Sequence, residues 1–218
     1  MILTIIRTFY KLIGRLGISK SKYGIKNGYK DRKTVTHFLD MEFSDEWQDE
    51  VYSLAKLFFD NNSFKSIIDV GTGSGYKLIK YFSDFDTIGM EIEPGLTALK
   101  NKYPNRKWLN PLESDFSVLQ SDIVITSDVI EHVPDPIAFL KNIKKIKNVK
   151  YYFISTPERK NLYNSLDFGP PTNTHHYREW QYDEFHNFIS EEFEIVYHFL
   201  TNIPQSTQLI VCKIKSSI

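Results

Sequence analysis

The stretch 66–77, SIIDVGTGSGYK, decides the fold because it joins a buried strand to a glycine-rich turn. Two β-branched residues lead into Asp69, and glycines follow at positions 71, 73 and 75. Glycine permits positive φ angles and lets a ligand approach the backbone closely. An acid in front of these glycines would repel a phosphate group. The ligand expected at this turn therefore carries positive charge.

Strand and helix patterns alternate from residue 44 onward. The expected elements are a helix over 44–62, strand SIIDV, a helix over 75–83, strand DTIGME, a helix over 95–103, strand RKWL, strand SDIVITS, a helix over 135–147 and strand VKYYFIST. This alternation predicts right-handed βαβ units and a parallel sheet with helices on both faces.

The pattern changes after the last of these strands. Residues 157–180 have no clear periodicity and contain Pro170-Pro171. A helix over 182–190 then precedes two strands, FEIVYHFL and TQLIVCKI, which only the short segment TNIPQS separates. Strands joined so closely are antiparallel. The sequence thus predicts an α/β domain over 44–218, with a seven-stranded, mostly parallel sheet, an antiparallel last strand and an insert at 157–180.

Residues 1–43 form a separate basic arm in this interpretation. Positions 1–33 contain nine Lys or Arg residues against Asp31 alone, a net charge of +8 in a chain whose formal net charge is zero. The first 16 residues place apolar side chains at helical spacing, with Arg7, Lys11 and Arg15 on the other side. One reading is a helix lying in a membrane surface through residues 1–33. The other is a helix that packs on the body or on a second subunit of a homodimer.

The composition is that of a globular domain that can bury a core. The chain has 218 residues, 41% of them apolar, and no apolar run near the 20 residues of a membrane-spanning helix. The sequence contains a single cysteine, which excludes an internal disulfide framework and a cysteine-based zinc site. We expect a reducing compartment, the cytoplasm, with peripheral membrane contact as an alternative.

The glycine spacing narrows the ligand further. It is GxGxG, whereas a dinucleotide fingerprint is GxGxxG, and Lys77 does not fit a P-loop frame. Glu91 ends the second strand, twenty positions after Gly71, where an acid can accept hydrogen bonds from both hydroxyls of a ribose. An acid before the glycines, an acid for the ribose and no pyrophosphate signature indicate a cationic nucleoside. S-adenosylmethionine is such a molecule.

Four segments in order carry a family resemblance: IIDVGTGSG, GMEIEP, SDIVITSDVIEHVPDP and FISTPER. They resemble the successive motifs of class I S-adenosylmethionine-dependent methyltransferases over roughly residues 45–214. The resemblance implies a Rossmann-like class I methyltransferase fold, with S-adenosyl-L-homocysteine as the product. WQDEVYSLA, GSGYKL, STPER and GPPTNTHHYREW resemble a subgroup associated with surface-polysaccharide and glycan biosynthesis.

The resemblance also implies the residues that bind the cofactor. Asp69 would orient the methionyl ammonium through water, Glu91 would bind the ribose and Ile92 would pack on the adenine. Asp115 would meet the adenine amino group, and Ser127 would lie beside the methionyl end. The full cofactor set is Asp69, Gly71, Thr72, Gly73, Gly75, Glu91, Ile92, Asp115 and Ser127.

Methylation of a hydroxyl benefits from a general base. His176 and His132 are the candidates, with Asp128 beside the methionyl end of the cofactor. Each has a structural alternative: a loop anchor for His176, a packed helix-start residue for His132 and a helix cap for Asp128. The His, Asp and Glu residues show no tight ligand spacing along the sequence, so no catalytic metal is expected.

The 157–180 insert is expected to form the wall for the acceptor, because long ordered loops are usually functional. The residues expected there are Arg159, Tyr163, His175, Arg178 and Trp180, with packing of the aromatic side chains over the sheet edge as the alternative.

The leading interpretation is O-methylation of a sugar hydroxyl on a glycan or its lipid- or nucleotide-linked precursor. The alternatives are a methyltransferase for a quinone or carboxylic acid and a non-catalytic, membrane-associated scaffold that retains the fold. Nucleic acid is disfavoured, because SDVI stands where methylation of a base amine would want a DPPY- or NPPF-type segment.

Overall fold

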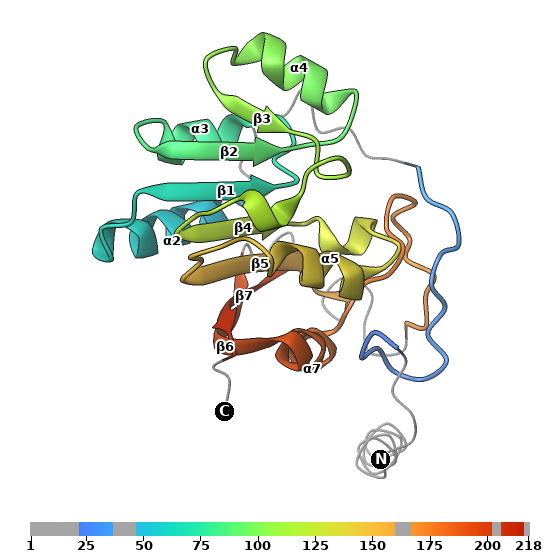
Figure 1. Cartoon of the computed structure of the whole chain (residues 1–218). Helices are drawn as coiled ribbons and strands as arrows, with labels where there is room; N and C mark the ends of the chain where they lie inside the picture. Colours follow the sequence, from blue (N-terminus) through green and yellow to red (C-terminus); the bar gives the residue numbers. More distant parts are fainter. Residues whose placement is uncertain (1–21, 37–46, 160–166, 202–205, 216–218) are drawn as a thin grey trace.

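One mixed sheet of seven strands forms the centre of the molecule. The computed structural model describes residues 22–36, 47–159, 167–201 and 206–215. The strands are β1 (Ser66–Val70), β2 (Asp86–Met90), β3 (Lys107–Leu109), β4 (Ile123–Ser127), β5 (Tyr151–Pro157), β6 (Phe193–Thr201) and β7 (Thr207–Ile214). Their order across the sheet is β3-β2-β1-β4-β5-β7-β6 (Figure 1). β7 pairs antiparallel with both β5 and β6, and the other pairs are parallel. The predicted fold class is confirmed.

Helices cover both faces of this sheet (Figure 1). They are α2 (Asp49–Asn61), α3 (Tyr76–Phe82), α4 (Gly95–Lys102), α5 (Pro136–Ile143) and α7 (Tyr182–Glu192), with short 3-10 helices η1 (Phe116–Val118) and η2 (Ile130–His132). Asp135 and Pro136 fix the start of α5. The Asp135 carboxylate accepts hydrogen bonds from the backbone N–H groups of Ile137 and Ala138, and Pro136 occupies the first turn.

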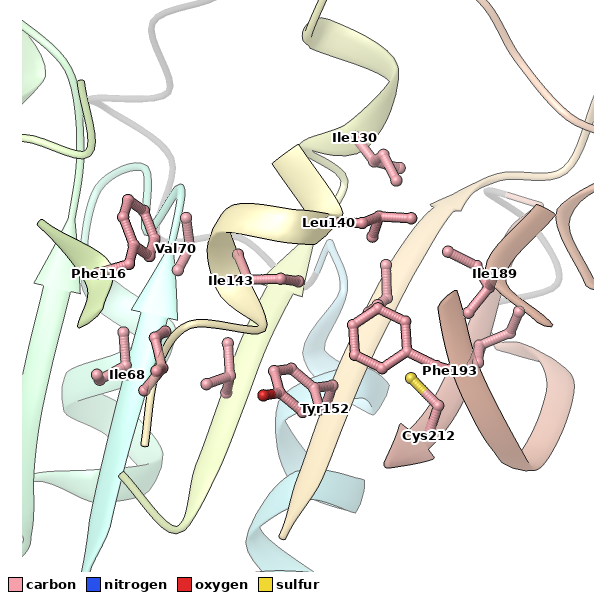
Figure 2. Packing of buried hydrophobic residues seen from close by; sticks show 14 of the residues in the cluster. Ile68, Val70, Phe116, Ile130, Leu140, Ile143, Tyr152, Ile189, Phe193 and Cys212 are labelled. Atoms are coloured by element: carbon pink, nitrogen blue, oxygen red, sulfur yellow. The ribbon is translucent and has the colours of Figure 1, made fainter. Parts of the chain in front are cut away.

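Alternation along the strands sends side chains into two separate cores. Ile68 and Val70 of β1 belong to the core under α5 and α7, whereas Ile67 belongs to the core under α2, α3 and α4. Figure 2 shows the first core, in which Leu140 and Ile143 of α5 lie over the sheet strands. The sheet is therefore buried on both faces, and its strands' carboxyl ends are left to form a site.

Residues 22–36 do not form an independent arm. Ile25 is 1% exposed and is part of the core under α5 and α7. The backbone N–H of Lys30 donates to the carbonyl of Phe168, and that of Arg32 donates to the carbonyl of Tyr177, both at 2.8 Å. In Figure 1 this segment runs beside the chain that follows β5. Residues 22–36 therefore pack on the body, and the boundary between residues 43 and 44 stays a prediction.

The amphipathic helix predicted near the N-terminus lies outside the described residues, so the two readings of it stay predictions. Within the ranges that the structure describes, no helix is both long enough and apolar enough to cross a membrane.

Candidate functional site

A cavity of about 450 Å³ opens at the carboxyl ends of β1, β2, β4 and β5. This volume is typical of a small-molecule site. We call one side the cofactor wall; it consists of Gly71, Thr72, Gly73 and Glu91. We call the other the polar wall; it consists of Asp128, Glu131, His132, Asn173 and His176.

The glycine turn gives the cofactor wall its shape. Gly71, Gly73 and Gly75 have φ angles of 81°, 55° and 71°, a region that residues with a side chain rarely adopt. A Cβ on Gly71 would lie 2.3 Å from Cγ2 of Val129, so no larger residue fits there. Gly75 caps the start of α3. The turn thus exposes backbone atoms to the cavity, as the sequence predicts.

Glu91 ties this turn to the end of β2. Its carboxylate accepts hydrogen bonds from the backbone N–H groups of Gly73 and Ile92, both at 2.9 Å. Glu91 lines the cavity, so its oxygens can also accept bonds from a ligand. This placement fits a ribose with two hydroxyls at the end of the second strand.

Asp69 lies just below the turn. Its Oδ2 accepts hydrogen bonds from Tyr52 Oη at 2.9 Å and Thr72 Oγ1 at 2.7 Å. Its Oδ1 is buried and has no hydrogen-bond partner among the described residues. Burial raises the pKa of Asp69 to about 6, although both hydroxyls and Lys77 oppose this shift. The carboxylate is not among the groups that line the cavity, so it acts on a ligand there through Tyr52 and Thr72, which are.

Asp128 begins the polar wall at the end of β4. Its φ angle of 52° turns the chain sharply away from the sheet. Its carboxylate accepts hydrogen bonds from Gln48 Nε2 at 2.9 Å and Ser155 Oγ at 2.8 Å. Ser127, also in the cavity lining, shares a 2.8 Å hydrogen bond with Ser155. Burial raises the pKa of Asp128. Contrary to the alternative, Asp128 does not cap α5, because Asp135 does.

Glu131 is a buried acid in η2. Its Oε2 accepts a hydrogen bond from Thr156 Oγ1 at 2.9 Å, and its Oε1 has no hydrogen-bond partner in the described part of the chain. Burial, together with the nearby charge of Asp128, raises the pKa of Glu131 well above its ordinary value. A carboxylate in this position needs a proton or a cation to offset its burial.

Two histidines complete the polar wall, with their rings 4.7 Å apart and nearly perpendicular. His132 Nδ1 lies 3.0 Å from the carbonyl oxygen of His175. His176 Nδ1 lies 2.6 Å from Glu179 Oε1, and Asn173 Nδ2 lies 2.9 Å from His176 Nε2. A carbonyl or carboxylate oxygen only accepts, so each Nδ1 carries the ring proton. In both neutral rings Nε2 is therefore the basic nitrogen.

The fold brings together groups that the sequence separates. One ligand-type atom from each of Glu131, His132 and His176 lies within 4.8 Å of the other two. The prediction of no metal rested on the absence of tight ligand spacing in the sequence. That spacing does not give the distances in the folded chain, because the loop after β5 returns His176 to the end of β4, 44 positions away from His132.

Two residues predicted to bind the acceptor belong to the core instead. Arg159 is 0% exposed, and its guanidinium forms hydrogen bonds to both carboxylate oxygens of Glu184 and to the carbonyl of Glu179. Trp180 is also 0% exposed and stacks on Phe188. Neither lines the cavity, because each anchors the segment before α7 to the body.

Arg178 and His175 are likewise outside the cavity lining. Arg178 is 3% exposed and donates to the carbonyls of Val133 and Pro134. His175 Nδ1 lies 2.8 Å from the carbonyl of Thr36, on the side away from the cavity lining. These contacts hold the loop before α7 against η2. The fifth predicted acceptor residue, Tyr163, lies outside the described residues.

Of the nine predicted cofactor residues, four do not line the cavity: Asp69, Gly75, Ile92 and Asp115. Asp115 is exposed and caps η1 by accepting a hydrogen bond from the backbone N–H of Ser117 at 2.9 Å. Hydrogen bonds from the side chain and then the backbone of Ser117 lower the pKa of Asp115. The structure gives Asp115 a local role in place of the predicted contact with adenine.

Sequence reasoning missed several lining residues, among them Trp47, Gln48, Tyr52, Lys77 and Asn173. The first three belong to the segment that starts α2, which was read as a helix and as part of the subgroup resemblance but not as a source of site residues. Tyr52 would have been hard to find, because a tyrosine at helical spacing usually packs in a core. Asn173 had a signal, since it stands in the same polar run as His176.

Comparison with known proteins agrees with this geometry. The family model described as "Methyltransferase domain" matches residues 42–196, more than half of the chain. A search of curated proteins found no sequence match.

Solved structures share the fold at low sequence identity. The methyltransferase domain of bacterial CtHen1-C is 16% identical, with 78% of this chain and 99% of that chain covered and a TM-score of 0.61. A S-adenosylmethionine-dependent methyltransferase from Clostridium acetobutylicum ATCC 824 is 12% identical, with 79% and 93% covered and a TM-score of 0.60. The plantazolicin methyltransferase BpumL, solved with SAH, is 14% identical, with 77% and 83% covered and a TM-score of 0.57. The chain therefore belongs to the methyltransferase-domain family.

Proposed function

We propose that this protein transfers a methyl group to a hydroxyl oxygen of a sugar, on a glycan or its activated precursor. When bound, S-adenosyl-L-methionine supplies a methyl group on a positively charged sulfur, ready for in-line displacement. The observation that carries the proposal is that two imidazoles, His132 and His176, line the same cavity as the glycine turn.

The cofactor wall fits this cofactor without rearrangement. The glycine turn exposes backbone where a nucleoside must approach closely, and Glu91 offers carboxylate oxygens at the position of a ribose. Below the turn, the buried charge of Asp69 favours a cationic group in the cavity. Thr72 and Tyr52 hold that carboxylate in place.

The polar wall fits a hydroxyl acceptor. His132 and His176 present basic Nε2 atoms that can accept a hydrogen bond from a hydroxyl and so direct its oxygen toward the methyl group. Ser127, which also lines the cavity, precedes Asp128 of the polar wall at the end of β4. The protein's main contribution is then to align the acceptor oxygen, the methyl carbon and the sulfur. Such alignment can lower the activation barrier by about 7–11 kcal/mol.

The lining also supports a sugar over a quinone. Most of its side chains are acids, amides, hydroxyls or imidazoles, although carbon atoms make up the larger part of its surface, and its apolar side chains include Trp47 and Val129. Trp47 is 46% exposed at the rim, where an indole face can stack on a sugar ring. A flat apolar acceptor would leave the buried polar groups without partners, which is unfavourable. A solved relative by fold, the mitomycin 7-O-methyltransferase MmcR, also transfers to oxygen, at 12% identity and a TM-score of 0.56.

The test has two stages. Calorimetry first measures binding of S-adenosyl-L-methionine to the full chain and to Glu91→Ala. The variant loses charge-assisted hydrogen bonds of about 1.5–3 kcal/mol each, so its affinity should fall at least tenfold. A panel of glycans, sugar nucleotides, quinones and carboxylic acids is then screened with labelled methyl donor. Cofactor binding without transfer to any sugar, but with transfer to a quinone or acid, would contradict the sugar assignment.

A further inference from the structure

We infer that Glu131, His132 and His176 bind a first-row divalent transition-metal ion beside the methyl-transfer site. The catalytic part of this inference rests on the proposed O-methyl transfer, whereas binding of the ion does not. The three side chains lie on the polar wall and offer a carboxylate oxygen and two imidazole nitrogens within 4.8 Å of one another.

The Nδ1 atoms of both histidines make the kind of contact that metal-binding histidines make. A ligating imidazole is neutral, and its other ring nitrogen usually donates to a carboxylate or a backbone carbonyl. His176 has the first arrangement, with Nδ1 2.6 Å from Glu179 Oε1, and His132 has the second, with Nδ1 3.0 Å from the carbonyl of His175. Both contacts leave Nε2 as the ligand atom. Two histidines that only packed in a core would not need Nδ1 hydrogen bonds of this kind on the same wall of a cavity.

The burial of Glu131 is a second, independent reason to expect a cation at this place. It is 0% exposed, lines the cavity, and its Oε1 has no hydrogen-bond partner among the residues that the structure describes. This oxygen lies 3.9 Å from Nε2 of His132, too far for a hydrogen bond but on the side where an ion would join them. A buried carboxylate oxygen is costly to leave unpaired, and a cation offsets that cost.

The same wall carries more acid than base. Asp128 and Glu179 adjoin Glu131, and both add negative charge next to it. Among the described residues that line the cavity, Lys77 is the lysine that opposes this negative charge, and it acts on Asp128. A divalent ion among three carboxylates is therefore electrostatically favoured.

The donor set selects the ion. Two imidazoles and one carboxylate suit manganese, iron, cobalt or zinc, whereas magnesium prefers oxygen ligands and keeps its waters. Ligand atoms about 2.1 Å from one ion lie at most about 4.2 Å apart, so the side chains must close slightly on binding. Asn173, which now donates to Nε2 of His176, must turn away and release that nitrogen.

Three protein ligands leave coordination positions for the acceptor. A hydroxyl oxygen bound to the ion has a lowered pKa, so its proton passes to water while the oxygen keeps the electron pair. That pair forms the new bond to the methyl carbon, and the electrons of the broken sulfur–carbon bond remain on sulfur. The histidines thus act as ligands that position the acceptor rather than as the base.

The direct test is metal binding to the tag-free chain after removal of metal with chelator, without cofactor or acceptor. Co²⁺ is titrated by calorimetry and visible absorption, and Mn²⁺ by electron paramagnetic resonance. We expect one ion per chain. Glu131→Gln and His176→Asn should each weaken binding at least tenfold, and Glu179→Gln, which loosens His176, by about 10–100-fold. The matched control is His186→Asn, an exposed histidine of α7 outside the lining, which should bind as the unmodified chain does.

Thermal unfolding verifies that each variant is folded, and His132→Gln replaces Glu131→Gln if the latter is not. The inference is overturned if the unmodified chain binds neither ion at millimolar concentration, or if the folded variants bind as tightly as it does. Failure to bind S-adenosyl-L-methionine would defeat the proposed function but not the ion site. Once an acceptor is known, chelated enzyme should lose turnover and recover it with Mn²⁺ or Co²⁺. Turnover that chelation leaves unchanged would overturn the catalytic role.

Discussion

The two walls of the cavity differ in how the chain builds them. The cofactor wall comes from short, continuous segments: the glycine turn directly after β1 and Glu91 directly after β2. The polar wall joins the end of β4 to a loop more than forty residues later. The cofactor wall is formed mainly by backbone whose position the strand ends fix. The polar wall is formed by side chains that contacts among neighbouring residues hold in place. We therefore expect variants of the two walls to separate cofactor binding from turnover.

The largest effect should come from the polar wall. His176→Ala removes an imidazole that positions the acceptor, and turnover should fall by about 10²-fold or more. Cofactor affinity should stay nearly unchanged, because His176 makes no contact with the cofactor wall. Steady-state and single-turnover kinetics with an identified acceptor measure the loss. Near-normal turnover in both His176→Ala and His132→Ala would show that neither imidazole takes part.

The next effect concerns the stability of the cofactor wall. Gly71→Ala places a Cβ at a φ angle of 81° and 2.3 Å from Cγ2 of Val129. Strain and overpacking should lower the free energy of unfolding by about 2–4 kcal/mol. Urea unfolding measures this loss. Gly28→Ala is a matched control for the φ strain alone, because its φ is 84° but the nearest atom to its Cβ lies 3.6 Å away. An equal loss in both variants would remove the close contact with Val129 from the explanation.

A smaller, pH-dependent effect is expected at Asp69. Its folded pKa of about 6 exceeds its ordinary value of 3.8, so the folded protein holds this proton more tightly than the unfolded chain does. Stability from this group is present below pH 4 and is lost as the pH rises through 6. Asp69→Asn should therefore stabilise the protein by up to about 3 kcal/mol above pH 6, and by nothing below pH 4. Urea unfolding of both proteins from pH 4 to pH 8 tests this, and a pH-independent difference would contradict it.

The smallest effect should be at Asp115. Asp115→Asn keeps a capping side chain on η1, and the residue lies outside the cavity lining. Stability should change by less than about 0.5 kcal/mol, and cofactor affinity should not change. A clear loss of affinity in calorimetry would restore the contact with adenine that the sequence resemblance implies.

The features that could be predicted from the sequence are mainly those of the cofactor wall, and those that could not belong mainly to the polar wall. The alternation of strands and helices, the reversed β7 and the glycine turn rest on local patterns, and the structure confirms them. Asp69 and Glu91 were found because strand ends fix their positions.

Arg159, Arg178 and Trp180 were misplaced because polarity in a long loop was read as exposure, whereas these side chains tie the loop to the core. The proximity of Glu131, His132 and His176 could not be read from spacing, since it depends on where that loop returns. The packing of Ile25 was missed for a related reason: the basic charge of its segment concealed the apolar anchors.

The central claim is that the two walls do separate work, and one calorimetric series tests it most directly. S-adenosyl-L-homocysteine is titrated, with chelator present, into the unmodified chain, Glu91→Ala and His176→Ala. The account predicts binding to the unmodified chain, a loss of at least tenfold in Glu91→Ala and unchanged affinity in His176→Ala. Unchanged affinity in Glu91→Ala, or an equal loss in both variants, would contradict the division of the cavity into two walls.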